Sequence, residues 1–144
     1  AHTMTALATA FARPKRGVGR QISVPVNASS VIHKGGLVAL DSDGFAIPAA
    51  DTASTRVVGV AIESKTGGAS DGDVRVIVEY DAEFLFTASS ITRAMTASGA
   101  AMCVVDDNTV DDAAGPTNDI YVGQLTDFVS TTSGWVYVPG LMKA

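Results

Sequence analysis

The sequence is dominated by short runs in which apolar and polar side chains alternate, and each run ends at a turn rich in Gly or Asp. Val74, Val76 and Val78, for example, occupy every second position of one run. A period of two places alternate side chains on opposite faces of a β-strand, whereas a helix requires a period of about 3.6 residues. Turn signals recur roughly every 8–12 residues, which is typical of β-sandwiches and β-barrels. We therefore expect an all-β fold of about nine to ten short strands, either a small barrel or a sandwich.

Three local signals predict how these strands end and pair. The turn Asp41-Ser-Asp-Gly44 combines residues that favour tight turns, so 37–48 is expected to be a hairpin. Pro25 cannot donate a ladder hydrogen bond, which predicts that its strand lies at a sheet edge. Gly59, inside 56–62, indicates a β-bulge or the close approach of another backbone.

One segment, 89–97, is expected to be a short helix. Ser89 or Ser90 can cap its start, and Gly99 can end it in a left-handed conformation. The Asp-rich segment 106–118 is expected to form turns and loops, because Asp and Asn are favoured there.

The last strands are expected to form a second hairpin, 120–129 with 134–139. Alternation within it puts Trp135 and Tyr137 on one face and the intervening valines on the other. Aromatic side chains are enriched at the buried centres of protein interfaces. Trp135 and Tyr137 are therefore expected to lie in the core or at a subunit interface.

Charge is divided sharply along the chain. Residues 1–40 carry five Lys and Arg and no acid, a charge of +5, whereas residues 41–144 carry five Lys and Arg against fifteen acids, a charge of −10. Such a division is typical of an interacting arm joined to a folded body. We interpret 1–20 as an extended basic arm that becomes ordered against a partner, and 21–144 as a single β-rich domain that stays folded without the arm.

The arm offers apolar anchors and cations on an extended backbone. Pro and Gly within 13–20 are incompatible with a regular helix. No aromatic residue lies among the cations and the body is strongly acidic, so an acidic protein surface is a better expected partner than nucleic acid. The expected contact residues are Leu7, Phe11, Arg13, Lys15, Arg16 and Arg20.

No combination of residues predicts catalysis. Ser29, Ser30, His33 and Asp41 lie close in sequence because turns attract polar residues. Cys103 lies in an apolar run and is expected to be a small buried hydrophobe rather than a nucleophile. We therefore expect neither an enzyme nor a bound cofactor.

The Asp-rich segment raises the question of a bound cation. Five oxygen-bearing side chains lie close together there: Asp106, Asp107, Asn108, Asp111 and Asp112. Such groups can bind a cation, but they are equally favoured in solvated turns, so the sequence leaves this open and predicts no metal site. No run approaches the roughly 18 apolar residues of a membrane span, so no membrane partner is expected.

Several strand and turn motifs occur in a recurring order. They are Ile22-Ser-Val-Pro-Val26, His33-Lys-Gly-Gly-Leu-Val-Ala-Leu40, Phe45-Ala-Ile-Pro-Ala49, Arg56-Val-Val-Gly-Val-Ala-Ile62 and Gly72-Asp-Val-Arg-Val76. In this order they resemble the capsid decoration (cement) proteins of tailed bacteriophages. The resemblance covers about 22–80 well and extends loosely through Gly134-Trp-Val-Tyr-Val138.

The resemblance implies a β-tulip or β-barrel body, a homotrimer, and a place on the outer surface of the phage head in the virion. Members of the family bind neighbouring major capsid proteins, often through an N-terminal arm, and stabilise the shell against the pressure of packaged DNA. The expected function is therefore structural. The residues also leave open a carbohydrate-binding β-domain of a virion or secreted protein, in which Tyr121, Trp135 and Tyr137 would stack on a sugar.

Overall fold

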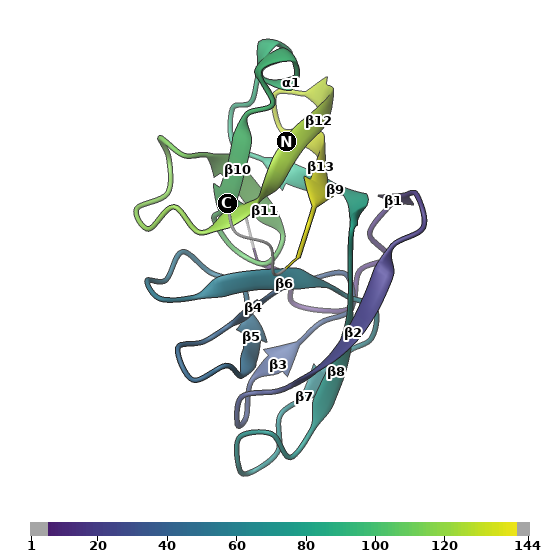
Figure 1. Ribbon diagram of the computed structural model, residues 1–144, viewed down its shortest axis with the longest axis vertical. Helices are drawn as coiled ribbons and strands as arrows, with labels where there is room; N and C mark the ends of the chain where they lie inside the picture. The colour runs from purple at the N-terminus through teal and green to yellow at the C-terminus, as the bar shows by residue number, and fades with distance from the viewer. Residues whose placement is uncertain (1–5, 141–144) are drawn as a thin grey trace.

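The computed structural model describes residues 6–140 and shows a nearly all-β chain, with one short helix in that range. The strands form two main sheets and a small two-stranded ladder, β3 with β7 (Figure 1). This confirms the expected all-β class. The elements in chain order are β1 (Lys15–Arg16), β2 (Arg20–Pro25), β3 (Val31–Ile32), β4 (Leu37–Leu40), β5 (Ala46–Pro48), β6 (Arg56–Ala61), β7 (Lys65–Thr66), β8 (Arg75–Tyr80), β9 (Ala82–Ala88), α1 (Ala94–Ser98), β10 (Ala101–Val104), β11 (Thr109–Asp112), β12 (Tyr121–Ser130) and β13 (Ser133–Val138).

One sheet closes into a five-stranded barrel. Its strands follow the order β9-β11-β10-β12-β13, and β13 returns to pair with β9 along its length. Within β13, Val136 and Val138 are buried and Trp135 and Tyr137 are half-buried, which confirms the predicted alternation. The barrel forms the upper part of the molecule in Figure 1, where α1 contacts β12.

The other sheet is open, with the order β2-β8-β6-β4-β5, and lies below the barrel in Figure 1. Strand β2 forms one edge, as Pro25 predicts. Arg75 covers part of this edge, because its guanidinium donates to the hydroxyl and the carbonyl oxygen of Ser23 at 2.9 Å each. Arg75 belongs to β8, but its charged group lies against the edge strand, where a charge discourages pairing with another chain.

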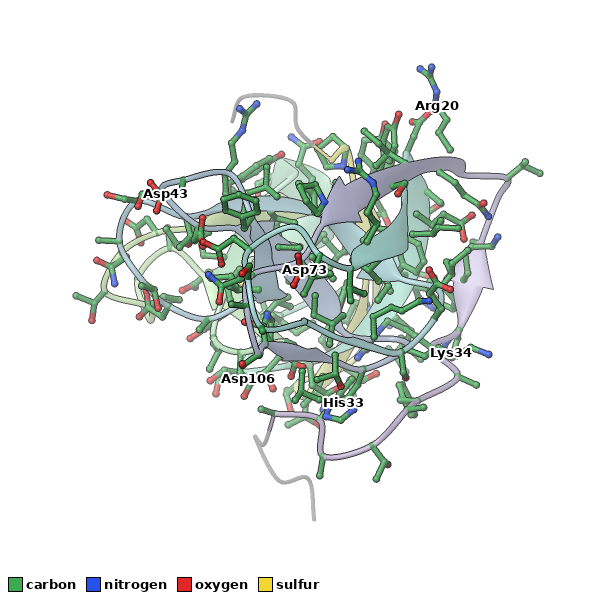
Figure 2. All side chains as sticks on the ribbon, turned by 90° about the horizontal axis from the view of Figure 1, so that it is seen from below. Arg20, His33, Lys34, Asp43, Asp73 and Asp106 are labelled. Carbon is green, nitrogen blue, oxygen red and sulfur yellow. The ribbon has the colours of Figure 1, made fainter. Side chains whose placement is uncertain are left out.

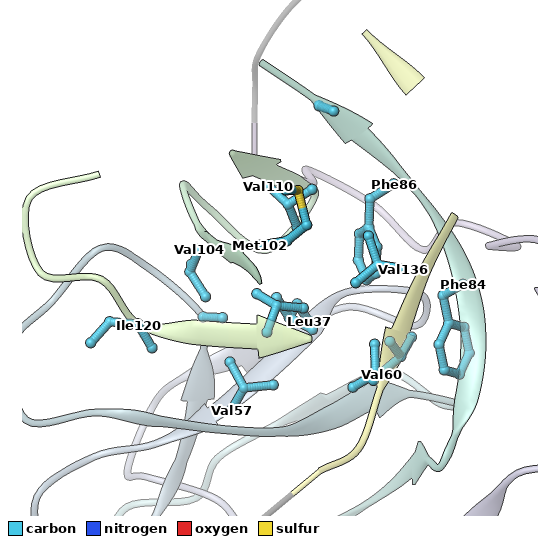
Figure 3. Close-up of a cluster of buried hydrophobic side chains, with 14 of the residues drawn as sticks. Leu37, Val57, Val60, Phe84, Phe86, Met102, Val104, Val110, Ile120 and Val136 are labelled. Atoms are coloured by element: carbon cyan, nitrogen blue, oxygen red, sulfur yellow. The ribbon is translucent and has the colours of Figure 1, made fainter. Parts of the chain in front are cut away.

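A shared core joins the two sheets. Leu37, Val57 and Val60 of the open sheet belong to the same buried cluster as Phe86 and Val136 of the barrel (Figure 3). A second, smaller cluster lies mainly in the open sheet, includes Ile32 of β3, and consists mostly of valines. Because the larger cluster crosses both sheets, we expect them to unfold as one cooperative unit.

The hairpin of β4 and β5 is confirmed, and Asp41 explains its turn. One carboxylate oxygen of Asp41 accepts the backbone N–H groups of Asp43 at 2.9 Å and Phe45 at 3.0 Å. The other oxygen accepts the side-chain amide of Asn27 at 2.9 Å. These bonds lower the pKa of the Asp41 carboxyl, and the bond from Phe45 is the largest cause.

Both features expected of Gly59 are present. The ladder between β4 and β6 shifts register between Val38 and Ala39, which pair with Gly59 and Val57. A Cβ at Gly59 would lie 2.4 Å from the carbonyl oxygen of Glu79 on β8. The glycine therefore sits in a bulge where another backbone approaches closely.

For the helix expected at 89–97, the predicted start is wrong and the predicted end is confirmed. Helix α1 begins only at Ala94, with Arg93 at its N-cap position, so neither serine caps it. Ser90 has a positive φ of 55°. Ile91 is fully buried against the barrel and its N–H donates to the β12–β13 turn, which holds this stretch out of the helix. Gly99 ends the helix with a φ of 65°, as predicted.

Part of the Asp-rich segment, expected to be loop, forms strand β11. It pairs with β10 and, in parallel, with β9. Thr109 and Val110 are fully buried in it. The neighbouring aspartates, which favour turns, masked this short strand in the sequence.

Replacement of Thr109 by valine is expected to stabilise the protein. Its hydroxyl is buried and has no hydrogen-bond partner among residues 6–140. Thr109→Val keeps the shape and removes the unsatisfied group, so the free energy of unfolding should rise by about 1 kcal/mol in urea denaturation. Exposed Thr66 on β7 is the control, since Thr66→Val should change stability by less than about 0.5 kcal/mol. A loss of stability in Thr109→Val would contradict the prediction.

Candidate binding surface

Residues 7–16, part of the expected arm, lie across the surface of the same chain, and we call this segment the strap. The N–H of Leu7 donates to the carboxylate of Asp107 at 2.9 Å, and the N–H of Phe11 donates to the carbonyl of Lys34 at 2.7 Å. The end of the strap forms β1, which pairs with β9 of the barrel. The strap is therefore fastened to the turn before β4, to the β10–β11 turn and to the barrel wall.

Gly35 allows the strap to approach this closely. Its φ is 85°, and a Cβ at this position would lie 1.9 Å from the carbonyl oxygen of Phe11. Any other side chain would therefore collide with the strap and adopt an unfavourable backbone conformation. The sequence predicts a turn at His33–Gly36, but not that the turn seats the strap.

Arg13 is the central contact of the strap. Its Nε donates to the carbonyl of Gly35 at 2.6 Å, one terminal nitrogen donates to the carbonyl of Leu85 at 2.8 Å, and the other donates to the side-chain oxygen of Asn108 at 2.7 Å. The guanidinium carbon also lies 4.5 Å from the centre of the Phe86 ring. One side chain thus connects the turn before β4, strand β9 and the β10–β11 turn.

Burial of Arg13 changes its acid–base properties. Desolvation lowers its pKa to about 10, although the carboxylates of Asp107 and Asp106 oppose the shift. Arg13 therefore remains charged at neutral pH. Burial also raises the pKa of Asp107, while the bond from the Leu7 N–H lowers it. Arg13 makes three hydrogen bonds from this largely desolvated position. Removal of such a charged group is strongly destabilising because its partners lose their bonds.

The next two cations of the arm are paired within the chain. Lys15 forms an ion pair of 2.8 Å with Glu79, which is 8% exposed in its side chain. Arg16 forms an ion pair of 2.9 Å with Asp127, and its guanidinium lies 4.0 Å from the centre of the Trp135 ring. These contacts hold β1 against the open sheet and the outer face of the barrel.

The turn after β1 projects from the body. Val18 at its tip is 95% exposed. Arg20 follows and points away from the molecule (Figure 2), with its guanidinium 5.9 Å from the centre of the Tyr80 ring. Phe11, at the other end of the strap, is 42% exposed. Phe11, Val18 and Arg20 are thus large side chains of the expected arm that face solvent.

The expectation of an arm ordered only against a partner is corrected for residues 7–16. Acids of the body, Glu79 and Asp127, face the strap, so two cations of the basic region are paired with acids of the same chain. The paired residues are 64 and 111 positions apart in sequence, which hid them from sequence analysis. Adjacent Gly35 and Gly36 were the available signal of a close backbone approach.

The aromatic residues of β13 are already engaged within the chain. Arg16 covers a face of the Trp135 ring. The hydroxyl of Tyr137 donates to the carboxylate of Asp81, and this bond is the main reason that the pKa of Tyr137 is raised. Their assignment to a subunit interface stays a prediction.

The Asp-rich cluster is used mainly to bind backbone N–H groups. Asp106 accepts the N–H of Asn108, Asp107 accepts that of Leu7, and Asp111 accepts that of Asp112. No group of three or more His, Cys, Asp or Glu within residues 6–140 is arranged to hold a metal ion.

Ser70 has the sequence context of a nucleophile elbow without its structure. Gly68-Ala-Ser-Asp-Gly72 has the Gly-x-Ser-x-Gly pattern, which in hydrolases marks a sharp strand-to-helix turn. Here the segment is a loop between β7 and β8, and the backbone N–H of Ser70 donates to Asp73. The pattern therefore carries no catalytic argument.

Cys103 is buried in β10, as predicted, and should react slowly with thiol reagents. Desolvation is the main cause that raises its pKa to about 11, and nearby aspartates, Asp119 first, add to the shift. Since the raised pKa favours the protonated thiol in the folded state, its contribution to stability is complete below about pH 8.5 and is lost as the pH rises towards 11. At pH 8, the native protein should react with Ellman's reagent far more slowly than protein unfolded in about 6 M guanidinium, a concentration above the usual unfolding midpoints. Equal rates would show that the thiol is accessible.

Comparisons with known proteins leave the chain without an assigned family. No family model matches it, and no curated protein is similar enough to count as a relative. No helix within residues 6–140 is long and apolar enough to cross a membrane. The structure therefore establishes a small all-β barrel protein with an N-terminal strap.

Proposed function

We propose that this protein is a capsid decoration (cement) protein that binds the outside of a tailed-phage head and stabilises the shell. The observation that supports this best is where the resembling motifs lie. The motifs within 22–80, where the resemblance is good, contribute to β2, β4, β5, β6 and β8, which together form the whole open sheet. The looser match at 134–138 lies in β13 of the barrel. Motifs that resemble one family and assemble into one sheet are better support than motifs scattered over the fold.

The strap supports a structural role in which a preorganised segment binds the partner. Its backbone and Arg13 are fastened to the body, so residues 7–16 need little ordering when a partner binds. Preorganised contacts increase affinity because less conformational entropy is lost on binding. We propose that the major capsid protein is contacted by the solvent-facing part of the arm, especially Phe11 and Arg20. A homotrimer would multiply weak contacts into strong avidity.

The proposal is tested by co-sedimentation of the full chain with expanded heads that lack their decoration protein, taken from the phage that encodes it. Binding should saturate at a fixed ratio to the major capsid protein and should raise the temperature at which heads release DNA. Absence of saturable binding would refute the proposal.

The charge of Arg20 provides a sharper prediction. Arg20→Glu should weaken binding to heads by about tenfold at low salt, with a smaller difference at high salt, because exposed charges are screened. Arg56→Glu is the matched control, since Arg56 is also an exposed strand residue but lies on β6. Equal effects of the two variants would indicate that overall charge, not the arm, determines binding.

A carbohydrate-binding domain is the alternative from the sequence, and the structure lends it less support. Arg16 covers one face of Trp135, and the hydroxyl of Tyr137 is bonded to Asp81. A sugar would have to displace the first contact to stack on that face. Saturable binding on a glycan array, together with failure to bind heads, would favour this alternative.

A further inference from the structure

A hollow of about 280 Å³ lies between the strap and the body. Its lining includes Val60, Ile62 and Phe84 of the body, and Phe11 and Ala12 of the strap. Val60 and Phe84 are 2% and 3% exposed, so this part of the lining belongs to the packed core. The hollow is thus an apolar recess with one wall made by the strap.

The polar groups around this recess are mainly cationic. Arg13, Lys15 and Lys34 line it together with one acid, Glu79, so the local formal charge is 3 − 1 = +2 in a chain whose net charge is −5. Lys15 is paired with Glu79, and the nitrogens of Arg13 donate to fixed acceptors.

Lys34 is the cation that remains available to a ligand. Among residues 6–140, the ion pairs are Lys15–Glu79 and Arg16–Asp127. The side chain of Lys34 is exposed and points outward from the body (Figure 2). Lys34 therefore places one ammonium group at the outer side of the recess, which has an apolar floor.

We propose that this recess binds an apolar side chain that lies next to a carboxylate in a segment of the partner protein. The apolar side chain would contact Val60, Ile62 and Phe84, and the carboxylate would pair with Lys34. The identity of the partner, the major capsid protein, rests on the proposed function. The recess is slightly smaller than the range of about 300–1,000 Å³ for drug-sized ligands, which suits a single side chain.

The lining favours this ligand over a phosphate or a nucleic acid. Recognition of a phosphate backbone uses several donors and cations along a track. Here a single available ammonium group lies beside aliphatic and aromatic carbon. Burial of apolar surface would supply most of the affinity, and the ion pair would supply orientation and selectivity.

The site can be tested with a small probe and the full chain. We would titrate ¹⁵N-labelled protein with N-acetylphenylalanine, which combines a ring with a carboxylate, and follow amide shifts by NMR. Shifts should concentrate at Gly35, Ile62 and Phe84, with a Kd of about 1 mM, as expected for a single-residue ligand. N-acetylphenylalaninamide, which lacks the carboxylate, should bind at least about threefold more weakly.

Two variants and their matched controls locate the site. Ala12→Trp should fill the recess and Lys34→Glu should repel the carboxylate, so each should weaken probe binding by about fivefold or more. Ala10→Trp on the strap and Lys65→Glu on β7 are controls at positions that are also exposed but lie outside the lining, and these variants should bind the probe normally. Shifts spread over the surface, or equal effects of variants and controls, would overturn the site.

Binding to phage heads separates the two proposals. If Lys34→Glu and Ala12→Trp weaken both probe binding and head binding, the inference is supported. If they weaken probe binding while head binding is unchanged, the partner assignment is overturned and the proposed function stands. If wild-type protein binds the probe but no heads, the proposed function fails. The partner assignment, which rests on that function, then fails too.

Discussion

Arg13→Met is expected to lower the free energy of unfolding by about 3 kcal/mol. The substitution keeps much of the aliphatic stem but removes the donors to the carbonyls of Gly35 and Leu85 and to the side chain of Asn108. It also removes the cation from the face of Phe86. Urea denaturation monitored by tryptophan fluorescence would measure the change.

Two further variants distinguish the geometry of Arg13 from its charge. Arg13→Lys keeps the charge but cannot place three donors in a planar fork, so it should recover less than half of the lost stability. Arg56→Met removes an exposed arginine that lies outside the strap and should change stability by less than about 0.5 kcal/mol. Equal losses in Arg13→Met and Arg56→Met would show that Arg13 does not connect the sheets.

Gly35→Ala is expected to displace the strap and lower stability by about 3–4 kcal/mol. The new Cβ would meet the carbonyl oxygen of Phe11 at 1.9 Å, a distance that backbone atoms cannot accommodate without movement. Displacement of the strap would also withdraw Arg13 from its acceptors. Trypsin should then cut after Lys15 and Arg16 faster than in the wild-type protein, which provides a direct measure of strap release.

Gly44→Ala is the matched control for this substitution. Gly44 has a similar φ of 90°, but a Cβ there would meet nothing within 4 Å. Gly44→Ala should therefore lower stability only through the unfavourable backbone conformation, by about 1–2 kcal/mol, without faster cleavage at the strap.

In the double variant with Arg13→Met, the Gly35→Ala effect should be much less than additive, since both changes break the same contact. Full additivity would contradict the model of one fastened strap.

Local sequence signals predicted most of the strands because they depend on neighbours in the chain. The turn at Asp41 is closed by the residue's own carboxylate and nearby N–H groups, so its residue types suffice to identify it. The position of Pro25 on an edge strand and the bulge at Gly59 likewise follow from what one residue can or cannot do. Alternation in β13 correctly separated Trp135 and Tyr137 from the buried valines.

Errors arose where distant contacts override local preference. Ile91 is drawn into the barrel core, which shortens the expected helix. Strand β11 is short and contains Asp111 and Asp112, yet it completes the barrel because β9 and β10 both pair with it. In each case burial and ladder hydrogen bonds outweigh a weak propensity of a few tenths of a kcal/mol per residue.

The sequence by itself determined the all-β class, the main hairpins and the division of charge between the N-terminal segment and the body. Only the tertiary structure decided where that charge goes. Arg13, Lys15 and Arg16 have partners between 22 and 111 residues away, and Gly35 lets the backbones meet. A period or a turn motif reports contacts between near neighbours, whereas ion pairs across sheets depend on how the sheets pack. For that reason residues 7–16 of the basic segment form a fastened strap, and Phe11, Arg20 and Lys34 remain exposed.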